Sequence, residues 1–189
     1  MRRVLKQQAV GRRVRGLRTE RGLSLRGLAS ATGFSPSFIS QLEHGQVSPS
    51  ISSMEKIAEA LQVTLGEFFA AAAEAEGGLV VKAAERAQMT SSWSNAAIDA
   101  LSPMASNRRL EPVLITLQPG ARSGKHPYPH PREEFAYVLE GEVTLTLGPE
   151  EHRLRRGDAA TILPRELRLW ENRGRRVARV LLVSSRFPS

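Results

Sequence analysis

The chain lacks features that would tie it to an oxidising compartment or to a membrane. It contains no cysteine, so disulfides and thiolate metal sites are excluded, and cysteine usage says nothing about redox environment. No run of about 18 apolar residues occurs, and Lys6, Gln7 and Gln8 interrupt any apolar signal segment after the basic N-terminus. We therefore expect a soluble, cytoplasmic protein without a membrane partner.

Acidic residues are scarce in one region of the chain. Residues 1–50 carry nine Lys or Arg against two Glu, whereas the rest of the chain holds 18 basic and 17 acidic side chains. The formal net charge of +8 therefore arises almost entirely near the N-terminus. Positive charge concentrated in this way favours a polyanionic partner such as nucleic acid, which would meet the N-terminal region.

The apolar pattern changes along the 189 residues, which is long enough for two domains. Apolar residues recur at helical spacing from Val10 to Phe69, whereas from Val113 onwards they alternate as in strands. We expect a multidomain fold of the α plus β class. It comprises a helical DNA-binding domain at 1–70, a linker at 71–82 and an all-β domain at 83–189. Residues 83–109 are weakly patterned and predict no particular element.

The segment from Leu25 to Gly45 has the pattern of a helix, a glycine turn and a second helix. Ser24 and Ser35 stand at expected N-caps, and Pro36 at a first helical position. The second helix of such a unit can enter the major groove while the first crosses the backbone. Candidate groove contacts are Pro36, Ser37, Ser40 and Gln41, and candidate phosphate contacts are Arg12, Arg13, Arg15 and Arg26. The two cap residues, Ser24 and Ser35, are further candidate DNA-binding residues. Among them, Gln41 has the amide that can read an adenine edge.

These residues resemble the Cro/repressor-type (XRE) helix-turn-helix family. The words that carry the resemblance are residues 18–25, Leu28-Ala29, and residues 39–43 followed by Gly45. The resemblance implies five helices between Val10 and Phe69. It also implies a structural ion pair between Arg18 and Glu43. Leu25 departs from the family, in which many members carry a DNA-contacting glutamine at that position.

The densest chemistry of the second half lies between Gly120 and Glu134, where His126, His130 and Glu134 could ligate a divalent metal. The segment resembles the first motif of a cupin, whose spacing Gly120, His130, Glu134 and Gly141 match. A second motif begins at Gly157 and ends at Asn172. The resemblance implies a cupin-type β-barrel, the double-stranded β-helix, over residues 110–183.

The metal ligands of this cupin pattern are incomplete. Tyr128 and Arg168 stand where the family pattern has histidines, and a guanidinium repels cations. We therefore expect no cofactor, with His126, His130 and Glu134 as the ligands if a divalent metal does bind. The alternative is a metal-free pocket for a small polar or zwitterionic effector. Its predicted lining is Tyr128, His130, Glu134, Arg168 and Trp170. A plainer interpretation is that Arg168 and Glu134 simply pair inside the barrel.

Both halves together resemble bacterial regulators in which a cupin senses an effector. We expect a sequence-specific transcriptional regulator, a repressor more than an activator, and no enzyme. A homodimer could read two operator half-sites about 34 Å apart on double-stranded DNA. Two alternatives stay open: a metal-dependent cupin enzyme tethered to DNA, and an antitoxin-like DNA binder whose β domain holds a protein partner.

Overall fold

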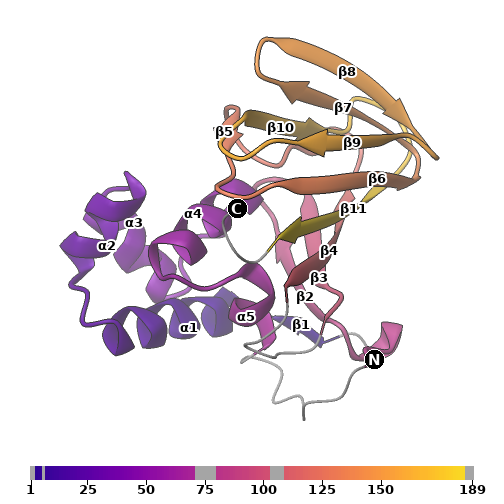
Figure 1. Cartoon of the computed structure of the whole chain (residues 1–189). Coiled ribbons are helices and arrows are strands. Elements are labelled where there is room, and N and C mark those ends of the chain that lie inside the picture. Colours follow the sequence, from indigo (N-terminus) through magenta and orange to yellow (C-terminus); the bar gives the residue numbers. More distant parts are fainter. Residues whose placement is uncertain (1–2, 6, 71–79, 103–108, 186–189) are drawn as a thin grey trace.

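The computed structural model describes residues 3–5, 7–70, 80–102 and 109–185. After a short N-terminal strand, helices occupy the first half of the chain and strands the second (Figure 1). The coarse prediction of a helical part followed by a β-rich part is thus confirmed. Most of the predicted linker, residues 71–79, lies outside the described residues. In the described ranges, no helix is both long and apolar enough to cross a membrane.

The helices include the two that the sequence predicts between Leu25 and Gly45. Their bounds are α1 (Gln7–Glu20), α2 (Leu25–Thr32), α3 (Pro36–Glu43), α4 (Ile51–Ala60) and α5 (Leu65–Ala70). Ser24 and Ser35 are N-caps, since their hydroxyls accept the amides of Gly27 and Phe38 at 2.9 and 3.1 Å. Gly33 ends α2 with φ of 71°, a left-handed conformation that glycine adopts at little cost.

The helical core joins all of these helices and explains their apolar spacing. Its fully buried side chains come from α1 to α4 and the turn that follows: Val14, Leu28, Ile39, Met54, Ile57 and Leu61. Helix α1 crosses the end of α3 so closely that a Cβ on Gly11 would overlap the carbonyl oxygen of Leu42. The helices therefore form one packed unit that positions α3 rigidly.

The β-rich part consists of two sheets. The larger has the order β1-β2-β3-β4-β11-β6-β9, and the smaller the order β5-β10-β7-β8. The bounds are β1 (Arg3–Leu5), β2 (Ala87–Ser91), β3 (Ala96–Ala100), β4 (Leu110–Leu117), β5 (Tyr128–Pro129), β6 (Glu134–Glu140), β7 (Glu142–Leu147), β8 (Glu150–Arg155), β9 (Ala159–Ile162), β10 (Leu167–Glu171) and β11 (Ala178–Ser185). Inward residues alternate along these strands, as Val113, Ile115 and Leu117 do on β4.

Three strands were not predicted from the sequence. Strands β2 and β3 lie in the weakly patterned stretch 83–109, and β1 pairs in parallel with β2 at the edge of the larger sheet. Residues 3–5 therefore join the sheet of the β-rich part, although the sequence assigned them to the helical domain. A short 3-10 helix at Ala83–Glu85 precedes β2.

The helical and β-rich parts pack directly against each other. Helix α5 contacts β2, β3 and β4, and α4 lies beside the strands (Figure 1). The amide of Ser52 donates to the carbonyl oxygen of Ser123 at 2.9 Å. A Cβ placed on Gly124 would lie 2.5 Å from the hydroxyl oxygen of Ser52, so the two backbones meet closely at this point. The N-terminal turn of α4 is thus fitted into the β-rich part.

Candidate nucleic-acid interface and buried charged site

The N-terminal end of α3 presents small polar side chains to solvent. Pro36, Ser37 and Gln41 are exposed, and Ser40 is half-buried. On a helix, residues three or four apart share a face, so Ser37, Ser40 and Gln41 lie together. This face is free to meet base edges, whereas Ile39 and Leu42 hold the opposite face in the core.

The predicted phosphate contacts are four arginines, together with the capped N-termini of α2 and α3. Arg12, Arg15 and Arg26 are exposed, and Arg13 is half-buried. Ser24 and Ser35 are exposed too, but their hydroxyls already cap α2 and α3. Their capping role therefore orients the amides at the two helix N-termini, which are themselves suited to bind phosphate.

Arg18 and Glu43 form the ion pair that the family resemblance implied. The Nε and Nη2 atoms of Arg18 donate to the two carboxylate oxygens of Glu43 at 2.6 and 3.0 Å. The Nη1 atom donates to the carbonyl oxygen of Leu23 at 2.7 Å. The pair is nearly buried and ties α1 to the end of α3, so it holds α3 in place.

A second buried ion cluster lies between the two sheets and is centred on Arg168 of β10. Its side chain is 0% exposed, and its Nε donates to the carboxylate of Glu134 on β6. Ser184 on β11 donates to the other oxygen of Glu134 at 3.1 Å. Two of the predicted effector residues, Glu134 and Arg168, are therefore paired with each other, as the plainer interpretation expected.

The structure adds a residue that the sequence did not indicate. Glu55 of α4 reaches across from the helical part, and the Nη2 and Nη1 atoms of Arg168 donate to it at 3.1 and 3.4 Å. The ring of Tyr128 lies under the same guanidinium, 4.8 Å from its central carbon. Arg168 thus has a carboxylate from each part of the molecule and an aromatic face beside it.

The ion pairs of this cluster determine the protonation states of Arg168 and Glu134. Burial works to lower the pKa of Arg168, but the charges of Glu55 and Glu134 outweigh it and raise that pKa well above the ordinary value. Burial likewise works to raise the pKa of Glu134, yet Arg168 and the hydrogen bond from Ser184 hold it below its ordinary value. Both side chains are therefore ionised at neutral pH.

The other predicted effector residues lie around the cluster at different depths. His130 is half-buried, with its Nδ1 atom 3.1 Å from the carbonyl oxygen of Arg132 and 3.8 Å from the Glu134 carboxylate. Trp170 is buried in the apolar core, where its backbone amide donates to the Ser123 hydroxyl at 3.0 Å. His126 is exposed and lines a different groove, together with Trp93.

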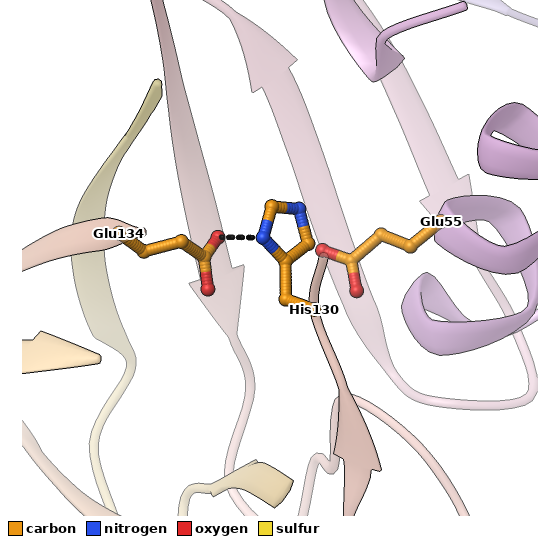
Figure 2. Close-up of side chains that lie close together, drawn as sticks. All are labelled: Glu55, His130 and Glu134. Atoms are coloured by element: carbon orange, nitrogen blue, oxygen red, sulfur yellow. Dashed lines mark ion pairs between the residues drawn. The ribbon is translucent and has the colours of Figure 1, made fainter. Parts of the chain in front are cut away.

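Three side chains near this cluster are of types that ligate metals. Figure 2 shows the imidazole of His130 between the carboxylates of Glu134 and Glu55, whose ligand atoms all lie within 4.8 Å of one another. Arg168, however, donates hydrogen bonds to both carboxylates and supplies the positive charge that a metal would bring. A cation placed there would be repelled by the guanidinium, so these residues do not fit a bound metal.

A small cavity borders the cluster where the helical and β-rich parts meet. Its volume is about 30 Å³, and Glu55 and Val63 line it from one side, His130 and Glu134 from the other. Glu111, whose pKa burial raises, also lines it and accepts the amide of Gly66. A cavity of this size holds about two water molecules. No metabolite fits it in this arrangement.

An exposed recognition helix on a basic helical unit, joined to a two-sheet unit with a buried charged site, defines a helix-turn-helix DNA-binding protein with an attached β domain. Family models agree: residues 14–68 match a helix-turn-helix domain and residues 113–184 match a cupin domain. The chain belongs to the family of HTH-type transcriptional regulators that carry a C-terminal cupin domain.

Individual relatives show the same organisation over most of their length. The chain is 32% identical over 155 residues to the HTH-type transcriptional regulator PuuR of Escherichia coli, covering 82% of each protein. It is 27% identical over 158 residues to the regulator SutR of the same organism, covering 84% of each. Its fold matches the crystal structure of an HTH_3 family transcriptional regulator from Vibrio cholerae with a TM-score of 0.76 and 24% identity, over 97% and 98% of the two chains.

Proposed function

We propose that the protein represses transcription by placing α3 in the major groove of operator DNA, and that a small polar effector bound between its two sheets controls this binding. The observation that carries the proposal is the exposed face of Ser37, Ser40 and Gln41 on a helix whose other face is buried. Arg12, Arg13, Arg15 and Arg26 supply phosphate contacts around it. The protein acts in the cytoplasm, where the operator is.

The proposal includes a homodimer, because one recognition helix reads only half of a palindromic site. The outer face of the larger sheet offers an apolar surface for it. On β6, Phe135, Tyr137 and Leu139 are 46%, 37% and 42% exposed. Leu181 and Val183 of β11 stand directly beside Tyr137 and Phe135 in the sheet. Such a continuous apolar patch on a soluble domain favours association with a second copy.

The effector site is proposed at Arg168, with Glu134, Tyr128 and His130 around it and Trp170 in the neighbouring core. A buried guanidinium held by ionised carboxylates can exchange one carboxylate for a ligand group. An enzymatic role is not part of the proposal, since Arg168 stands where the cupin pattern has a metal-binding histidine, and the matched relatives are named as transcriptional regulators.

A mobility-shift assay on the upstream region of the protein's own gene tests the DNA-binding half. Gln41→Ala should lower discrimination between operator and unrelated DNA by about 1–3 kcal/mol while leaving nonspecific affinity almost unchanged. The matched control is Gln118→Ala, an exposed glutamine of the β domain. Equal losses for specific and nonspecific DNA with Gln41→Ala would show that α3 is not the reading helix.

A further inference from the structure

We propose that Glu55 is a built-in competitor of the effector: a carboxylate group on the effector replaces that of Glu55 on Arg168 and so releases α4 from the β domain. This inference rests on the function proposed above, and it assigns the effector to the class of compounds that carry a carboxylate group. Docking of the DNA-binding domain and effector binding are then mutually exclusive, because both need the same guanidinium.

The two carboxylates on Arg168 differ in how readily each can leave. Glu134 belongs to the β domain itself, its side chain is 2% exposed, and Ser184 also holds it. Glu55 comes from the helical domain, and its side chain is 11% exposed. Its departure moves α4 but leaves the two sheets and the Arg168–Glu134 pair intact. Glu55 is therefore the partner that a ligand can displace.

The space around Glu55 shows why a ligand must displace it. The adjoining cavity of about 30 Å³ has room only for water, and α4 forms one of its walls. The hydrogen bond from the Ser52 amide to the Ser123 carbonyl oxygen holds the N-terminal turn of α4 against the β domain, and the missing side chain of Gly124 leaves room for this contact. Any metabolite that reaches Arg168 has to move α4 away from this position.

The hydrogen-bond donors that Glu55 leaves on Arg168 select the class of ligand. When Glu55 departs, the Nη1 and Nη2 atoms of Arg168 lose their acceptors. Unpaired buried donors are costly, so the displaced state requires a new acceptor pair. A carboxylate presents two oxygens in the geometry of the guanidinium fork, whereas an amine offers only further donors.

Displacement at Arg168 is connected to the recognition helix by packing. Helix α4 contacts α2, and its Met54 and Ile57 share one buried core with Leu28 and Ile39 of α2 and α3. When α4 leaves the β domain, α3 moves with it as part of the same unit. In a dimer joined through its β domains, this changes the spacing of the two recognition helices.

The first test uses acetate, which restores the carboxylate that Glu55→Ala removes, on the full-length chain. Against sodium chloride at equal ionic strength, acetate should raise the Tm of Glu55→Ala by an amount that grows with ln(1 + c/Kd), where c is the acetate concentration. Wild type should bind acetate at least about tenfold more weakly, because Glu55 competes at high effective concentration. The matched control is Glu20→Ala, an exposed glutamate of α1 that does not line the cavity, which should behave like wild type.

The second test measures domain separation by energy transfer. Because the chain has no cysteine, Ser30→Cys in α2 and Glu150→Cys in β8, both exposed, provide two labelling positions. Labelled chain is mixed with excess unlabelled chain so that transfer occurs within one protomer. Gly124→Ala, which overlaps Ser52 without altering charge, should lower the transfer efficiency and strengthen acetate binding. High acetate should lower the efficiency of wild type towards the same value.

Equal acetate affinity for Glu55→Ala and Glu20→Ala would overturn the exchange on Arg168. Stabilisation of Glu55→Ala by ethylammonium in place of acetate would overturn the ligand class. Unchanged transfer efficiency in Gly124→Ala and in acetate-saturated wild type would overturn the release of α4. Failure of wild type to bind its operator in the mobility-shift assay would instead defeat the proposed function, while the acetate comparison would still decide the ligand class.

Discussion

Glu55 and Arg168 lie 113 residues apart in the chain, and hydrogen bonds of 3.1 and 3.4 Å join them across the boundary between the helical and β-rich parts. Glu134 holds the same guanidinium from inside the β-rich part. One arginine therefore pairs with two carboxylates, so loss of Arg168 leaves both without a counter-charge, whereas loss of either carboxylate leaves guanidinium donors without acceptors.

Glu134→Gln should destabilise the β domain by about 3 kcal/mol at neutral pH, because Arg168 loses its charged partner between the sheets. The pKa of Glu134 is held below its ordinary value of 4.5, so its ionised form stabilises the fold above that pH. This contribution is lost as the pH falls below 4.5 through the folded-state pKa, and wild type and variant should then converge. Urea unfolding between about pH 7 and pH 3 measures the difference.

Glu133→Gln serves as the control for this experiment, since Glu133 is the neighbouring glutamate and is exposed. It should change the free energy of unfolding by less than about 0.5 kcal/mol at every pH. A Glu134→Gln difference that does not vary with pH would contradict the assigned pairing.

Arg18→Met should lower the unfolding free energy of the helical domain by about 3 kcal/mol, since Glu43 would stay buried without a counter-charge. Arg21→Met is the matched change, because Arg21 is exposed and bonds only Gln62 among the described residues. It should cost less than about 0.5 kcal/mol. Thermal or urea unfolding measures the loss of unfolding free energy in each variant. Similar losses for both variants would show that the Arg18–Glu43 pair contributes little.

The local part of this structure could be predicted from sequence because its causes are local. Ser24 and Ser35 cap their helices with hydroxyls three residues from the amides they bind, and Gly33 ends α2 in a left-handed turn. The Glu134–Arg168 pair was one of the alternatives that the sequence left open, because the cupin resemblance places both residues in register.

The contribution of Glu55 could not be predicted, because its signal is not local. On α4 it has the spacing of a solvated face, and its partner lies in the other domain. Only the docking of α4 on the sheets brings the two together. Strand β1 escaped prediction for a similar reason, since three residues form a strand only because β2 supplies the other half of the ladder. Ser184, by contrast, could have been identified from the sequence, because it is a polar residue on the inward face of β11.

Arg12→Ala should weaken binding to all DNA sequences by a similar factor and reduce the slope of log affinity against log salt by about 1, because one phosphate contact is lost. Arg156→Ala, an exposed arginine at the far end of the β domain, should leave the slope unchanged. Filter-binding or anisotropy titrations at several salt concentrations give both slopes. Identical slopes for Arg12→Ala and wild type would remove Arg12 from the interface.

Leu139→Lys should shift the protein from dimer to monomer, because it adds a charge to the apolar face of β6 that we propose as the dimer surface. Sedimentation velocity measures the change, and operator affinity should fall with it because the two half-sites are no longer read together. Leu167→Lys is the control, since Leu167 is 47% exposed but lies on the smaller sheet. A monomeric Leu167→Lys and a dimeric Leu139→Lys would place the interface on the other sheet.

Arg168→Glu reverses the charge at the centre of the cluster and Arg168→Lys keeps the charge without the guanidinium fork, whereas Arg168→His should introduce a metal ligand. The guanidinium that repels a cation is removed, and an imidazole joins Glu55, His130 and Glu134, whose ligand atoms already lie within 4.8 Å of one another. Three or four such ligands suit Zn²⁺ or Ni²⁺. Either ion should therefore raise the Tm of Arg168→His by an amount that grows with metal concentration and disappears with chelator.

Wild type should show no such shift, because Arg168 already supplies the positive charge between the carboxylates. Arg165→His, at an exposed arginine three residues earlier, controls for nonspecific metal binding. A metal-dependent Tm in wild type equal to that of Arg168→His would mean that Arg168 does not keep cations out of the site.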